Sequence, residues 1–174
     1  VLSLPGRGYS VALSPTGEVL AVGCMEGTVV LFNTTTDFEQ LCIFTAHEGG
    51  SGHKLRLCFD PLSVSTALVT SSSKDNDVKL WKLSNLISAA SPTPVSVFKG
   101  HTSGVNDVQF SEDGSLIATA SNDNTIKLWD PGTGQELHTL KGHTSWVCGV
   151  AFHPSHRSVL ASCGNDLSVC LWSA

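Results

Sequence analysis

Residues 97–130 have the sequence VFKGHTSGVNDVQFSEDGSLIATASNDNTIKLWD, and their pattern predicts the architecture of the whole chain. Gly100 and His101 stand at the fourth and fifth positions of this stretch, and alternating apolar residues follow up to Phe110. A turn with the sequence Glu-Asp-Gly follows, then a second apolar run, a tight Asn-Asp-Asn turn and a third run that ends at Trp129. Apolar alternation bounded by short polar turns is typical of antiparallel strands joined by hairpins. The stretch therefore predicts three consecutive strands of one sheet.

The same order of residues returns further along the chain. Gly142 and His143 start it again 42 residues after His101, and Trp172 closes it 43 residues after Trp129. A period of about 40 to 45 residues, with Gly-His before the first strand and Trp-Asp after the third, is typical of a four-stranded propeller blade. The sequence thereby resembles the WD40-repeat (WD-repeat) β-propeller family. The resemblance implies an all-β fold of four WD40-type β-propeller blades, each a four-stranded antiparallel sheet, in a partial propeller.

On this resemblance, residues 1–174 form one WD-repeat β-propeller region. The blades are expected at about residues 8–45, 54–98, 105–140 and 147–174, with residues 1–4 as a candidate outer strand that closes the fourth blade. Closed propellers have about four to eight blades. Three interpretations stay open. The four blades are a segment of a longer propeller, which the start and stop within a blade favour, or two copies combine into eight blades, or the ring closes at four.

The composition favours a turn-rich globular chain and disfavours a nucleic-acid-binding one. Hydrophobic residues make up 41% of the sequence, charged residues only 14%, and the formal net charge is −5. Surfaces that bind phosphates are basic, so the net charge argues against nucleic acid as a partner. The six cysteines show no CxxC spacing, which favours free thiols in a reducing, intracellular compartment, cytoplasmic or nuclear. No apolar run is long enough to predict a membrane span.

The resemblance also implies a buried chain of hydrogen bonds inside each blade. In this family it links a His before the first strand, a Ser or Thr on the second, an Asp in the next turn and a Trp on the third. A hydroxyl can accept the indole N–H while it donates to the imidazole. Counting ten and six residues back from each Trp selects the hydroxyl and the carboxylate. The sets are His101, Thr119, Asp123 and Trp129 in the third blade, His143, Ser162, Asp166 and Trp172 in the fourth, and His47, Ser71, Asp75 and Trp81 in the second, with His53 as the alternative imidazole.

The first blade departs from this pattern, because Val22, Glu26 and Phe32 stand at those offsets and no His precedes them. We expect apolar packing there, which can be close to neutral in stability relative to a polar network. The recurring His, hydroxyl and Asp are also compatible with a hydrolase triad, but a catalytic site needs one exposed nucleophile in a pocket. A set that recurs beside a Trp predicts a scaffold. We therefore expect no enzymatic activity, no cofactor and no metal site.

A binding surface is expected where the loops before the first strands and the turns before the third strands open on one end of the propeller. The resemblance implies that this end holds peptides or partner domains. Trp146 is the leading candidate, because it follows a short polar loop and Trp is the commonest binding hot spot. The alternative is that its ring only packs on a neighbouring loop. The other candidates are Gly104, Lys74, Asn122, Asn165 and Met25.

Together these features predict a non-catalytic protein–protein interaction scaffold or adaptor of the WD-repeat type, as a subunit or segment of a larger multiprotein assembly. Its partners would be other proteins or peptides, and a second copy or further blades of a longer chain would complete the ring. Two alternatives stay open. One is an RNA- or nucleoprotein-associated propeller module, which the net charge of −5 disfavours. The other is a reader of peptides or of their modifications.

Overall fold

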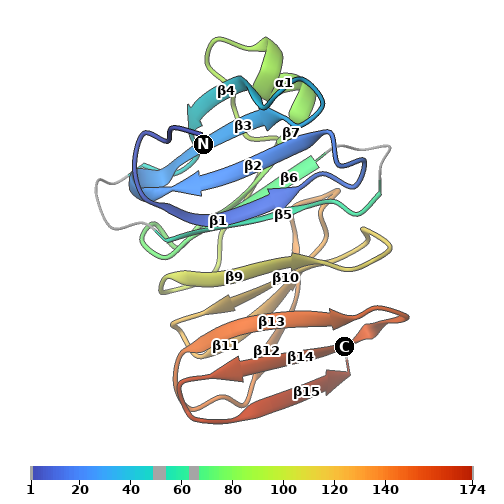
Figure 1. Ribbon diagram of the computed structural model, residues 1–174. Helices are drawn as coiled ribbons and strands as arrows, with labels where there is room; N and C mark the ends of the chain where they lie inside the picture. Colours follow the sequence, from blue (N-terminus) through green and yellow to red (C-terminus); the bar gives the residue numbers. More distant parts are fainter. Residues whose placement is uncertain (1, 49–53, 63–66, 174) are drawn as a thin grey trace.

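The computed structural model describes residues 2–48, 54–62 and 67–173. Four antiparallel sheets follow one another along the chain, and the described residues contain one short α-helix (Figure 1). Each sheet is a meander in which consecutive strands are hydrogen-bonded neighbours. This arrangement confirms the predicted all-β fold of propeller-type blades.

The strands of the first two sheets alternate with short turns. The first sheet contains β1 (Gly8–Leu13), β2 (Val19–Cys24), β3 (Thr28–Asn33) and β4 (Glu39–Thr45), with the 3-10 turn η1 (Met25–Gly27) between β2 and β3. The second contains β5 (Leu55–Phe59), β6 (Ala67–Ser72), β7 (Val78–Lys82) and β8 (Ser96–Phe98), with α1 (Leu83–Ser88) after β7. These two sheets form the first and second blades.

The third blade has four described strands and the fourth has three. The third contains β9 (Val105–Phe110), β10 (Ile117–Ser121), β11 (Thr125–Trp129) and β12 (Glu136–Lys141). The fourth contains β13 (Val147–His153), β14 (His156–Gly164) and β15 (Val169–Ser173). The first strands of the four blades, β1, β5, β9 and β13, contact one another in this order and form the inner edge of the stack.

The prediction that residues 1–4 close the fourth blade is wrong for the residues that can be judged. Leu2–Leu4 lie outside any strand, and the described part of the fourth sheet has the three strands β13, β14 and β15. The N-terminus lies beside the first blade, whereas the C-terminus lies on the fourth, at the other end of the stack (Figure 1). Leu2–Leu4 therefore do not pair with β15.

The hydrophobic core lies between the blades. Val29 and Leu31 of β3 share one cluster with Leu55 of β5. In the same way, Ile126 of β11 shares a cluster with Val147 of β13. Each aliphatic side chain that leaves water in this way contributes about 1.5–3 kcal/mol. Alternation along the strands thus supplies one apolar face for each neighbouring blade.

The outer faces of the first and fourth blades also carry apolar side chains, but no further described blade covers these two faces. Val11 and Leu13 of β1 are 69% and 60% exposed, and Val169 and Leu171 of β15 are 72% and 78% exposed. The strand pairing shows which inner residues correspond to them, and all of these inner residues are buried. They are Val108, Phe110, Ile126 and Leu128.

Candidate functional site

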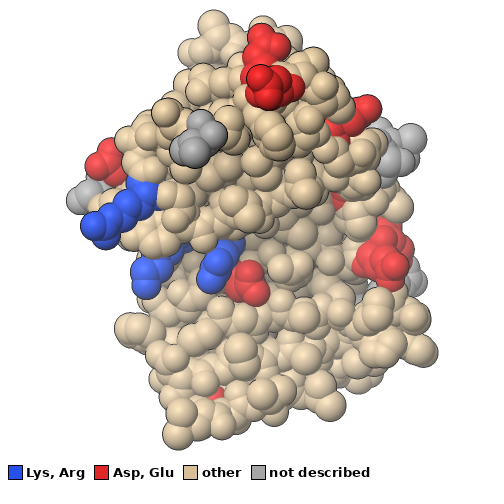
Figure 2. All heavy atoms as spheres, viewed as in Figure 1, with Lys and Arg blue, Asp and Glu red and all other residues tan. Residues whose placement is uncertain are grey.

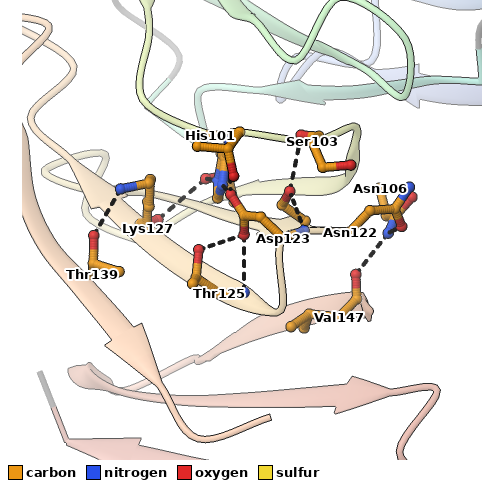
Figure 3. A network of polar contacts seen from close by, with 12 residues as sticks. His101, Ser103, Asn106, Asn122, Asp123, Thr125, Lys127, Thr139 and Val147 are labelled. Carbon is orange, nitrogen blue, oxygen red and sulfur yellow. Dashed lines mark hydrogen bonds and ion pairs between the residues drawn. The ribbon is translucent and has the colours of Figure 1, made fainter. Parts of the chain in front are cut away.

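The third blade contains a continuous chain of hydrogen bonds from its turn to its third strand, and Figure 3 shows the part at His101 and Asp123. Nδ1 of His101 lies 2.7 Å from Oδ2 of Asp123, and Nε2 lies 2.7 Å from Oγ1 of Thr119. The indole Nε1 of Trp129 donates to the same Oγ1 over 2.9 Å. Since a carboxylate only accepts, Nδ1 carries the proton and the Thr119 hydroxyl donates to Nε2. Every polar atom of the three side chains in the interior therefore has a partner.

Burial and hydrogen bonding set the charge states of the two titratable groups in this set of hydrogen bonds, His101 and Asp123. Burial lowers the pKa of His101 and outweighs the opposing effect of Asp123, so the imidazole is neutral. For Asp123, burial alone would raise the pKa, but the hydrogen bonds from Thr125 and His101 prevail and lower it. The result is an ionised carboxylate that accepts from a neutral imidazole.

The fourth and second blades repeat this geometry. In the fourth, His143 lies 2.7 Å from Asp166 and 2.8 Å from Ser162, and Trp172 donates to Ser162 over 2.8 Å. The pKa of Asp166 is lowered, first by the hydrogen bond from the Ser168 hydroxyl.

In the second blade the imidazole is His47, which lies 2.6 Å from Asp75. His53, the alternative imidazole, lies outside the described residues. The assignment of Ser71 as the hydroxyl is wrong, because Thr70 bonds both His47 (2.9 Å) and the indole of Trp81 (3.0 Å). The side chain of Ser71 lies on the other face of the strand, and its buried hydroxyl has no partner among the described residues.

The physical reason for this correction is the length of one turn. Thr70 lies opposite Lys79 as Thr119 lies opposite Lys127, but eight residues separate the first pair along the chain and seven separate the second. The extra residue falls between the hydroxyl and the carboxylate. An offset counted from the Trp therefore finds the Asp and misses the Thr, and a comparison of the turn lengths is the signal that could have found it.

Each of these sets joins segments within one blade, and its hydroxyl is buried away from any substrate. The Oγ1 of Thr119 lies in a fully buried residue and already accepts the indole N–H. A nucleophile must instead be exposed beside a pocket that can receive a substrate. Fully satisfied buried networks of this kind make a core more rigid. We therefore assign a structural role to them.

A groove of about 430 Å³ opens on the end of the propeller where the turns before the third strands lie. It brings together three of the predicted binding residues, Trp146, Asn122 and Asn165. Trp146 is 53% exposed, so most of its ring is available to a partner. Sequence reasoning missed the other lining residues, which come mainly from the first strands of three blades. They are Lys54, Arg56, Ser73, Asn106 and Cys148.

Hydrogen bonds within and between blades hold the groove in shape. Nδ2 of Asn106 donates to Oδ1 of Asn122 over 2.6 Å and to the carbonyl of Val147 over 2.8 Å (Figure 3). The backbone N–H of Asn165 donates to the carbonyl of Trp146 over 2.8 Å. Asn106 thus links the third blade to the fourth, and the turn of the fourth blade fixes the backbone that presents Trp146.

The remaining predicted binding residues do not line this groove. Gly104 is buried, and a Cβ there would lie 2.1 Å from the carbonyl oxygen of Ser73. Its prediction as a partner-binding residue is wrong, because the glycine serves the close approach of a turn of the second blade. Lys74 is exposed next to Ser73, and Met25 is half-buried with its N–H bonded to the carbonyl of Arg7.

Two further features bear on what the described residues can do. Among them, no group of three or more His, Cys, Asp or Glu is arranged to hold a metal ion. No helix in the described ranges is long and apolar enough to cross a membrane.

Comparison with curated proteins finds relatives of several kinds. Nuclear distribution protein PAC1 of Arthroderma benhamiae is 37% identical over 113 residues, which cover 60% of this chain and 23% of that protein. Coatomer subunit beta'-1 of Arabidopsis thaliana is 36% identical over 109 residues, covering 62% of this chain and 11% of that protein. Transcriptional corepressor LEUNIG_HOMOLOG of the same plant is 31% identical over 106 residues, covering 60% and 13%. The chain therefore spans less than a quarter of the length of these relatives.

Comparison with family profiles covers most of the chain. The profile described as WD domain, G-beta repeat matches residues 4–33, 38–82, 92–130 and 134–173. The first match contains β1, β2 and β3, and each later match begins with the outer strand of one blade and continues with the first three strands of the next. The chain belongs to the WD40 repeat family.

Proposed function

We propose that the protein is a non-catalytic scaffold that holds a protein partner in the groove at Trp146. The observation that carries this proposal is the exposure of Trp146, 53%, at a groove built from three blades. An exposed Trp beside a concave, polar lining is the composition of a binding hot spot. A ring that only packed on its own neighbours would be covered by them.

The relatives support the same class of function without naming a partner. One is a subunit of coatomer and another is a corepressor by its printed name, so each works with other proteins. Since this chain matches 11% and 13% of those two proteins, their own partners are not carried over. The rigid, hydrogen-bonded blades supply the platform, and the groove supplies the specific surface.

The test is the substitution Trp146→Ala. We expect the variant to lose the proteins that the purified wild type captures from cell extract, identified by mass spectrometry, while its melting temperature stays within a few degrees. The matched control is Phe38→Ala, which removes another exposed aromatic ring, 43% exposed, from the connection between β3 and β4. Capture of the same proteins by Trp146→Ala and the wild type would contradict the proposal.

We also propose that the outer faces of the first and fourth blades pack against further blades, from this protein or from a second copy. The support is the exposure of Val11 and Val169 at positions that are buried between the inner blades. Contiguous apolar faces of this kind mark interaction surfaces. We expect light scattering to give a mass above that of one chain and Val169→Asp to lower it. A wild type that stays monomeric at high concentration would contradict packing between copies.

The cysteines support an intracellular location. All six are free, and burial raises the pKa of Cys42 to about 11 and that of Cys24 as well. Buried thiols with raised pKa values are inert small apolar groups rather than reactive or paired ones. We propose that the protein works in a reducing compartment.

A further inference from the structure

The groove at Trp146 carries two cations and no acid among its described lining residues. Lys54 and Arg56 are both exposed, and because they are two residues apart at the start of β5 they lie on one face of the strand. Figure 2 shows basic side chains beside the hollow that crosses this face, with an acidic side chain next to them. This local charge stands out in a protein whose formal net charge is −5.

Arg56 is oriented by a hydrogen bond to the neighbouring third blade. Its Nε donates to the carbonyl of Asn106 over 3.2 Å, and this bond fixes the guanidinium between β5 and β9. The nearby carboxylate of Asp107 accepts from the backbone N–H groups of Val108 and Val150, each over 3.0 Å, and it lines a different cavity. No described acid forms a salt bridge with Lys54 or Arg56, although the charge of Arg56 acts on the Asp107 carboxylate and opposes the rise in its pKa that burial causes.

Two side-chain amides of the groove, those of Asn122 and Asn165, supply further hydrogen-bond donors beside these cations. Oδ1 of Asn122 accepts from Asn106 over 2.6 Å, and Oδ1 of Asn165 accepts from Sγ of Cys148 over 3.1 Å. No hydrogen bond among the described residues engages the Nδ2 group of either amide. Both side chains therefore present N–H groups to the groove, and a ligand must bring acceptors.

We infer that the groove binds an acidic peptide segment, whose carboxylates pair with Lys54 and Arg56 and whose apolar side chains pack on Trp146. This inference rests on the proposed function and adds the chemistry of the partner. Carboxylates match the fork of an arginine and accept from amide N–H groups. RNA fits less well, because two cations neutralise few phosphates and nucleic acids bind through many such contacts.

The experiment measures the fluorescence anisotropy of labelled peptides with the purified protein. The probe is Ala-Glu-Glu-Ala-Phe-Ala-Glu-Glu-Ala, and its neutral counterpart has Gln in place of each Glu. We expect the acidic peptide to bind at least about tenfold more tightly than the neutral one, a difference of about 1.4 kcal/mol. The double substitution Lys54→Gln and Arg56→Gln should remove this preference, and added salt should weaken it. Lys82→Gln, which changes an exposed lysine at the end of β7, is the matched control.

The outcomes separate this inference from the proposed function. Equal binding of the two peptides, with both weakened by Trp146→Ala, would overturn the acidic preference and leave the groove as a binding site. An acidic preference that survives Lys54→Gln with Arg56→Gln would place the charge recognition elsewhere and overturn the inference. Tighter binding of single-stranded oligouridine than of the acidic peptide, or no binding of either peptide at millimolar concentration, would also overturn it.

Discussion

The first and third blades have the same strand order but different interiors. In the third, Thr119 and Trp129 belong to a hydrogen-bonded chain that ends at Asp123. In the first, the strand pairing places Val22 and Phe32 at the two equivalent positions, and both are buried in a small apolar cluster with Cys24 and Val30. One sheet geometry is therefore compatible with a polar and with an apolar interior.

The difference shows what the polar chain contributes. Apolar packing tolerates small shifts, whereas a chain of directional bonds is satisfied in one register only. The chain also ties the loop before the first strand to the turn before the third, because His101 and Asp123 come from these two segments. In the first blade the turn is η1, and Glu26 at the equivalent position is exposed. We infer that the polar chain orders the end of the propeller that holds the groove.

The largest expected effect comes from removing the carboxylate at the end of the chain. Asp123 accepts from Nδ1 of His101 (2.7 Å), from the N–H of Thr102 (3.1 Å), and from both the N–H (3.0 Å) and the hydroxyl (2.6 Å) of Thr125. Asp123→Ala leaves these donors without their acceptor, and we expect a loss of about 3–5 kcal/mol in unfolding free energy. Glu26→Ala in the first blade should stay within about 0.5 kcal/mol. Urea unfolding of both variants measures the contrast, and similar losses would contradict it.

A smaller effect is expected where the hydroxyl alone is removed. Thr119→Val keeps the shape of the side chain but leaves the indole N–H of Trp129 and Nε2 of His101 unpaired in the interior. We expect a loss of about 2–4 kcal/mol in unfolding free energy. The reverse change, Val22→Thr, buries a hydroxyl in the apolar cluster and should cost about 1–2 kcal/mol. If Thr119→Val proved as stable as the wild type, the hydrogen bonds of the polar chain would contribute no more to stability than apolar packing does.

The fold could be predicted from the sequence because the polar chain repeats. The recurrence of His and Trp about 42 residues apart marks the blades, and the alternation between them marks the strands. The residue Thr70 could not be found by counting, because the register of β6 against β7 depends on the length of the turn between them. Counting assumes equal turns, and one extra residue moves every side chain to the other face.

The groove was predictable only in part. Trp146 and Asn165 lie near the turn of one blade, where the sequence pattern marks the exposed end. Arg56 reaches the same groove from a strand two blades earlier, and only the stacking of β5, β9 and β13 brings it there. Gly104 was misjudged because its position at a strand entrance says nothing about the carbonyl of Ser73 that packs on it.

The smallest expected effect is a pH dependence that the third blade has and the first lacks. Burial lowers the pKa of His101, so below its ordinary value of about 6.5 the unfolded chain takes up a proton that the folded chain does not. The unfolding free energy should therefore fall on acidification, by at most about 1 kcal/mol between pH 6.5 and 5.5 for this residue. Asp123, whose pKa is lowered by the hydrogen bonds that outweigh its burial, adds its loss only below about pH 3.8.

The measurement compares urea unfolding of the wild type and His101→Gln at several pH values. The other six histidines are common to both proteins, so the difference between the two slopes isolates His101. A wild type that lost less stability on acidification than His101→Gln would mean that the folded imidazole binds a proton beside Asp123. The polar chain would then contain an ion pair, and the third blade would differ from the first by buried charge as well as by hydrogen bonding.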